Sequence, residues 1–158
     1  MPTTIKRQKI IDAVEARART ILTTDPVGYY SNLGTNVFVW LSRPLQNTGV
    51  ISELPALVLR PTLNEPIELR AGSPPVQIDQ LMIDWEIIAA PGSLTEDRVW
   101  EMIIDWYKAI GTDPTWTNLA SDTNIGPDSF DYDQKENTLV GASGSIVVVY
   151  RHTQYLES

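Results

Sequence analysis

The chain has 158 residues, of which 42% are hydrophobic and 20% charged, and its formal net charge at pH 7 is −8. These values are typical of one soluble globular domain, and the acidic balance argues against sequence-independent nucleic-acid binding. The absence of cysteine excludes disulfides and zinc–thiolate sites and fits a reducing cytoplasm. No apolar run approaches the ~20 residues of a membrane helix, and the first residues lack the apolar core of a secretory signal. We therefore expect one domain over residues 1–158 with no membrane contact.

The first half of the chain predicts one helix and three strands. Apolar residues recur at helical spacing over Thr3–Leu22, with Thr3 or Thr4 available as N-cap. Strand-like stretches follow at Thr35–Ser42, Pro55–Arg60 and Val76–Ala90, and the third alternates apolar and polar residues. The intervening segment Pro61–Pro75 is polar and rich in proline, which predicts an extended arm or a large hairpin tip.

The second half predicts one helix and one strand. Ser93 and Glu96 have the spacing of a capping box for a helix over Leu94–Ile110. Asp113–Asn137 is expected to be an irregular acidic loop, and Gly141–Gly144 a turn into a buried strand over Ser145–Thr153. The order α-β-β-β-α-β predicts an α+β fold. We expect one antiparallel or mixed sheet of about four strands, with both helices packed on one face.

Apolar residues lie on both sides of two predicted strands. Phe38 and Trp40 alternate with Val37 and Val39, and the final strand is apolar on both faces. A domain of this size has too few elements to cover both faces of its sheet. We expect another subunit or the Pro61–Pro75 arm to cover part of it; the alternative is that loops fold over it. The candidate interface residues are Phe38, Trp40, Leu63, Ile67, Trp100, Trp116 and Arg151.

The sequence offers little that could carry catalysis. His152 is the one histidine; it has no nucleophile motif beside it, and we interpret it as a surface or interface residue. The carboxylates with regular spacing are interpreted as solvated faces, namely Asp84 and Glu86 on a strand and Asp97, Glu101 and Asp105 on the second helix. The acidic stretch Asp128–Glu136 lacks the spacing of a calcium loop and is interpreted as a mobile loop. We predict no catalytic, cofactor-binding or metal-binding residue.

The order of elements and several phrases resemble the tail terminator proteins of long-tailed phages. The similar features are the first amphipathic helix, the segment Pro55–Pro61 (PALVLRP), the stretch Asp113–Ala120 (DPTWTNLA) and the closing Val147–Arg151 (VVVYR). The resemblance covers nearly the whole chain and consists of phrases and their order, without an invariant signature.

The resemblance implies a virion protein, assembled in the host cytoplasm, that forms a homo-hexameric ring on the tail tube protein. Such a ring stops tube polymerisation and offers a surface to a neck or head completion protein, while DNA only passes through its lumen. Acidic residues on the inner wall would let DNA pass without adhering. Another head–tail joining or tail completion protein is the alternative. A small ion-binding module or a carboxylate-based enzyme is a remoter one.

Overall fold

The chain folds into two α-helices, a short 3-10 helix and five strands over the described residues, which are 5–46, 48, 52–90, 95–132 and 139–153 of a computed structural model. In chain order the elements are α1 (Lys6–Arg19), η1 (Leu33–Thr35), β1 (Val37–Val39), β2 (Ala56–Arg70), β3 (Val76–Ile88), α2 (Thr95–Thr112), β4 (Asp122–Tyr132) and β5 (Leu139–Thr153). The expected α+β class with two helices is confirmed. The proposed caps at Thr3, Thr4 and Ser93 lie outside the described residues.

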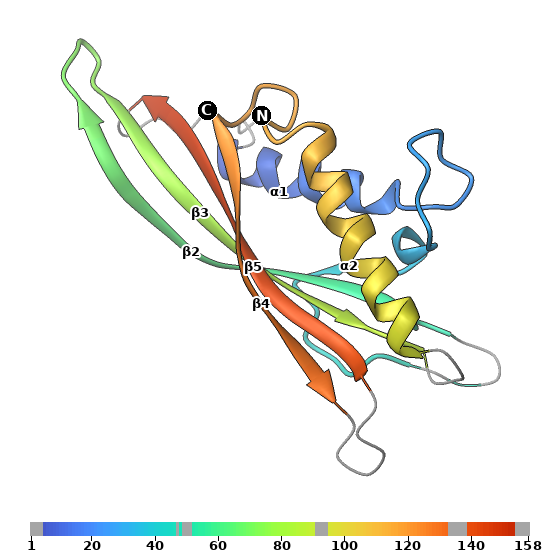
Figure 1. Ribbon diagram of the computed structural model, residues 1–158. Helices are drawn as coiled ribbons and strands as arrows, with labels where there is room; N and C mark the ends of the chain where they lie inside the picture. Colours follow the sequence, from blue (N-terminus) through green and yellow to red (C-terminus); the bar gives the residue numbers. More distant parts are fainter. Residues whose placement is uncertain (1–4, 47, 49–51, 91–94, 133–138, 154–158) are drawn as a thin grey trace.

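One twisted sheet with the strand order β1-β2-β3-β5-β4 forms the body of the molecule, and both helices lie on one face of it (Figure 1). β1 pairs with β2 in parallel, whereas the other neighbours are antiparallel. The expectation of about four strands in the order α-β-β-β-α-β is therefore wrong in detail, because β4 adds a strand. The sheet is mixed, since β1 reaches β2 through a crossover and not through a hairpin.

The predicted acidic loop Asp113–Asn137 is largely a strand. Residues Asp122–Tyr132 form β4 and pair with β5 along the edge of the sheet. Asp, Asn, Gly and Pro are poor strand formers, but pairing with a buried neighbour outweighs this preference at an edge strand whose side chains are mostly exposed. Residues 133–137 of the predicted loop lie outside the described residues.

The predicted turn at Gly141–Gly144 is also wrong, because these residues belong to β5. Gly144 faces Trp85 across the β3–β5 pair. A Cβ atom at Gly144 would lie 2.6 Å from Cζ2 of Trp85. Glycine is therefore required here because the Trp85 ring lies too close for a Cβ atom. The glycines suggested a turn in the sequence, but Gly144 instead makes room for this ring.

The core lies between the helices and the sheet face that they cover. The alternation predicted for the third strand is confirmed, since Leu81, Ile83, Trp85 and Ile87 are all buried. The helices contribute Ile10, Ile11, Val14 and Ala18 from α1 and Val99, Met102, Ile103, Trp106 and Ile110 from α2. Within the described residues, no helix combines the length and apolar character needed to cross a membrane.

The predicted strand Thr35–Ser42 is reduced to the three residues of β1. Trp40 follows directly, with a φ of 62° that leaves the extended region, and its N–H donates to the carbonyl of Leu59. A left-handed residue cannot continue a strand. Beyond this point, no described residue pairs with the outer edge of β2.

Candidate functional site

The sheet face turned away from the helices carries an apolar stripe across three strands. The pairing register aligns Leu63 of β2 with Met82 of β3, and Met82 with Val147 of β5. Val149 lies two residues further along β5 on the same face. Leu63 is exposed and the other three side chains are partly exposed. We call these four residues the outer stripe.

A loop covers another part of the same face. Leu41, Leu45 and Leu54 line a hollow together with Val58 of β2, and Val58 is buried. Phe38 is partly exposed, and the guanidinium of Arg43 lies 5.9 Å from its ring centre. At this end of the sheet, a loop therefore covers the apolar face, as the alternative expectation had it. The outer stripe is not covered by this loop.

A second exposed apolar surface lies where α2 meets β4. Trp100 and Ile104 are one helical turn apart and are 43% and 52% exposed. The ring of Trp100 lies 4.9 Å from that of Phe130 on β4, and Ile125 of the same strand is 47% exposed. We call these four residues the seam patch. Trp100 was predicted from the sequence as an interface residue, whereas Ile104 was not, although its spacing of four residues from Trp100 places both on one face of the helix.

Both open edges of the sheet resist pairing with another strand. The free edge of β2 contains Pro61 and Pro66, each next to a shift in register. The edge strand β4 has a register shift at Gly126 and Pro127. Proline lacks the N–H that a new strand would need, and bulges twist an edge away from partners. Contacts with another protein are therefore expected through side chains on the faces.

The β2–β3 hairpin projects beyond the helical layer as the predicted arm (Figure 1). At its root, Trp40 and Leu63 line one hollow of about 250 Å³ with Ile5, which precedes α1. Ile67 is exposed further along the arm. The structure thus brings together two of the predicted interface residues, Trp40 and Leu63, and leaves Ile67 apart from them.

No family model matches the chain. No curated protein matches it either.

The predicted interface role of Trp116 is wrong. Its side chain is fully buried, its Nε1–H donates to Oγ1 of Thr123 at 2.7 Å, and the guanidinium of Arg17 lies over its ring. The tryptophan enters the core because the chain turns sharply after α2. In the sequence it had looked like part of a loop, where a large apolar side chain suggests a partner.

The solvated-face interpretation is wrong for Asp105. Its carboxylate is fully buried and accepts hydrogen bonds from the N–H groups of Tyr30 and Ser31 and from Oγ of Ser31. These bonds attach the segment before η1 to α2. Glu101 is partly exposed, and the side chain of Asp97 lies outside the described residues.

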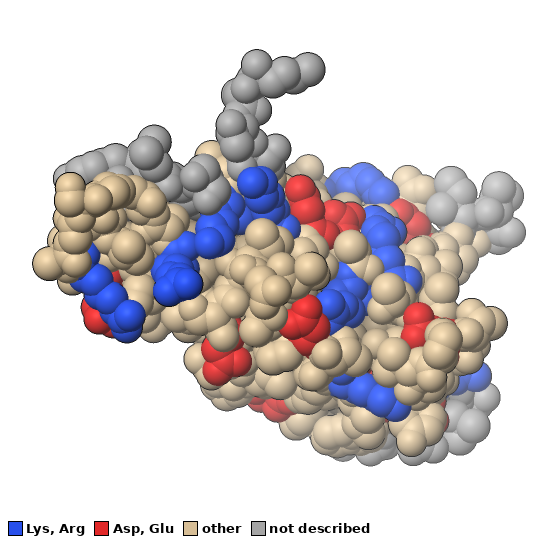
Figure 2. Space-filling view, turned by 90° about the horizontal axis from the view of Figure 1, so that it is seen from above, with Lys and Arg blue, Asp and Glu red and all other residues tan. Residues whose placement is uncertain are grey.

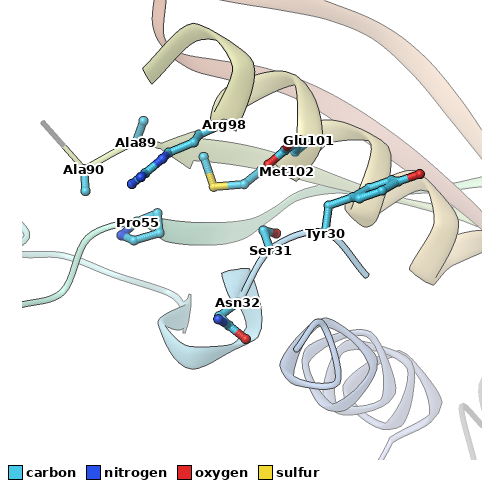
Figure 3. Close-up of a pocket in the computed structure, with 9 residues that line it drawn as sticks. All are labelled: Tyr30, Ser31, Asn32, Pro55, Ala89, Ala90, Arg98, Glu101 and Met102. Atoms are coloured by element: carbon cyan, nitrogen blue, oxygen red, sulfur yellow. The ribbon is translucent and has the colours of Figure 1, made fainter. Parts of the chain in front are cut away.

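A cleft of about 350 Å³ lies beside this attachment, between α2 and the ends of β2 and β3 (Figure 3). Arg98 and Glu101 reach it from α2, and Ser31 and Asn32 from the opposite side. Its size is near the lower limit of ligand pockets. Its lining combines one cation and one carboxylate, and no proton-transfer pair is formed among the described lining residues.

His152 is more enclosed than a surface residue, because only 7% of its side chain is exposed. Its Nε2 lies 2.9 Å from Asp79, which also accepts from Gln77 and Asn64. Burial opposes the charged form of Asp79, but these hydrogen bonds and His152 hold its pKa below the ordinary value. The cluster joins β2, β3 and β5 at the root of the arm.

Two further acidic residues, Glu86 and Asp128, have structural partners. Glu86 lies 3.3 Å from Arg60 across the β2–β3 pair, and Asp84 on the same face is exposed. Asp128 accepts a hydrogen bond from the Tyr107 hydroxyl at 2.6 Å; burial and this carboxylate raise the pKa of Tyr107. Asp128 thus belongs to β4, and not to a mobile loop.

Proposed function

We propose that this chain is a structural subunit that forms a ring on a phage tail tube, stops its polymerisation and offers the surface for head attachment. The observation that carries the proposal is the presence of two separate apolar surfaces, the outer stripe and the seam patch. The resemblance to tail terminator proteins supplies the identity of the assembly. A homo-hexamer, a tail tube protein and a neck or head completion protein are the partners that we propose.

Two different surfaces are what head-to-tail association requires. In a ring, one patch of each subunit contacts another patch of the next, whereas a two-fold dimer uses the same patch twice. The outer stripe lies on the sheet face opposite the helices, and the seam patch lies on the helical side at β4. Their positions on different sides of one subunit therefore favour a closed ring or an open filament over a symmetric dimer.

The projecting arm suits attachment to another component. Leu63, Ile67 and Leu69 are exposed along it, and its proline-containing edge disfavours strand pairing. We infer that the arm docks through side chains onto the tube or the neck.

Recombinant chain mixed with the tail tube protein of the same genome tests the proposal. Size exclusion with light scattering should detect a ring of six times the subunit mass of 17.7 kDa on the tube ends. A chain that stays monomeric at every concentration, with and without tubes, would refute the proposal. Assembly with neck components but never with tubes would assign the alternative of a neck protein.

A pair of variants tests the head-to-tail arrangement. Met82→Asp damages the outer stripe and Ile104→Asp damages the seam patch, so neither alone should form rings. Mixed together, they should form a dimer and no larger species, because each retains one intact surface. Ser129→Asp, which adds the same charge to an exposed position outside the stripe, serves as the control and should assemble normally. Rings from either damaged variant would contradict the arrangement.

A further inference from the structure

A hollow of about 330 Å³ lies between the start of α1, the turn after α2 and the end of β5. Lys6 and Arg151 reach it from the helix and the strand, and Thr115, Asn118 and Ser121 line it from the turn. Seen from above, Lys and Arg side chains are spread over this side of the molecule, with Asp and Glu among them (Figure 2). The hollow thus combines cationic side chains with hydroxyl and amide groups.

The two cations that line this hollow, and Lys9 near them, have no acidic partner in the part of the chain that the structure describes. Among the described residues, Lys6, Lys9 and Arg151 form no ion pair with a carboxylate, although the chain carries 20 acidic residues and 12 basic ones. Other cations do form such pairs, namely Arg17, Arg19, Arg43, Arg60 and Arg70. Positive charge at this place is therefore not neutralised by a carboxylate of the described residues.

The positive charges also repel one another. Burial, and then the charges of Arg151 and Lys9, lower the pKa of Lys6 from its ordinary value. The Lys6 ammonium donates one hydrogen bond to the main-chain carbonyl of Arg151 at 2.7 Å. An ammonium has three donors, so it keeps donors for a ligand. A bound anion would relieve the repulsion and satisfy them.

The wall formed by the turn is held in a costly conformation. Trp116, Thr117 and Asn118 have φ values of 52°, 60° and 64°, and left-handed backbone is disfavoured for residues other than glycine. The buried Trp116 ring and the Asp113 carboxylate hold the turn, since Asp113 accepts from Thr115 and from the N–H of Thr117. A wall shaped in advance loses little conformational entropy when a ligand binds.

We propose that this hollow binds the phosphate group of a small molecule or of free phosphate, with Lys6 and Arg151 as the charged donors. Paired cations with hydroxyl and amide neighbours are the chemistry that recognises an oxyanion. A nucleic acid is disfavoured because a polyanion is repelled by a protein of net charge −8. The proposal does not depend on ring formation, so the two can fail separately.

Titration of the isotope-labelled chain with inorganic phosphate, followed by amide NMR, tests this site. The amides of residues 115–121 should shift and saturate, and sodium chloride at matched ionic strength should not reproduce the shifts. Lys6→Gln and Arg151→Gln should each weaken binding about tenfold, as expected for loss of one charge-assisted hydrogen bond. Arg98→Gln removes an exposed cation from the separate cleft on α2 and should bind like the parent.

The outcomes are distinct. Tighter binding of glycerol phosphate than of inorganic phosphate would assign the phosphate of an organic ester, and equal binding would assign free phosphate. Shifts that never saturate, that chloride reproduces, or that survive in both glutamine variants would overturn the proposal. Circular dichroism of the variants without phosphate separates loss of binding from loss of folding.

Discussion

Replacing Trp116 with alanine tests whether the turn after α2 is part of the core. The side chain is fully buried, so its removal leaves a large cavity, and a Trp→Ala change in a core costs about 3–5 kcal/mol. The change also removes the hydrogen bond to Thr123 and the contact with Arg17. Because small domains are stable by only about 5–15 kcal/mol, this loss is a large share of the total.

Urea unfolding followed by circular dichroism measures the free energy of unfolding. Trp116→Phe retains most of the apolar volume but not the indole N–H, and should cost about 1–3 kcal/mol. Trp100→Ala is the matched control, because that tryptophan is 43% exposed, and it should cost about 1 kcal/mol or less. The assignment of Trp116 to the core is refuted if the free energy of unfolding of Trp116→Ala lies within about 1 kcal/mol of the parent value. It is also refuted if Trp100→Ala lowers that free energy as much.

Two further predictions concern acid stability and close packing. Hydrogen bonds from Arg43 and from the Gln46 N–H lower the pKa of Glu53 from 4.5 to about 2. A depressed carboxyl pKa stabilises the fold above the unfolded value, so stability should decline as the pH falls from 4.5 towards 2. Arg43→Gln should flatten this decline in urea midpoints measured across that range; an unchanged slope would contradict it. Gly34→Ala should destabilise by about 1–3 kcal/mol, because its Cβ would lie 2.5 Å from the carbonyl oxygen of Arg19. A Cβ atom at Gly111 would have no neighbouring atom within 4 Å, so Gly111→Ala should be neutral or stabilising. Equal melting temperatures for Gly34→Ala and Gly111→Ala would refute the packing argument.

Several elements could be predicted from the sequence because the spacing of apolar residues along the chain matches the geometry of a helix or a strand. The apolar spacing of α2 and the alternation along β3 each indicate which side chains face the core. Val99, Trp106, Ile83 and Trp85 are buried as those patterns required. The proline-rich segment after Arg60 was predicted to be an extended arm or a large hairpin tip, since proline restricts where a strand can pair.

The features that were not predicted from the sequence share a different cause. β4 is a strand because it pairs with β5, which follows it in the chain, and its own Asp, Asn, Gly and Pro residues give no strand signal. Asp105 is buried because the segment before η1 brings two N–H groups to it. His152 is enclosed because its side chain meets that of Asp79 on the neighbouring strand β3. The composition of a short segment does not indicate which other segment it will contact in the fold.

The sequence alone thus determined the α+β class, the two amphipathic helices, the alternating central strand and the expectation of apolar surface left for partners. Only the tertiary structure decided where that surface lies: it covers Val58 with a loop, buries Trp116, and exposes the outer stripe and the seam patch. The physical reason is that periodicity fixes the face on which a side chain lies, whereas its neighbours across that face depend on long-range pairing.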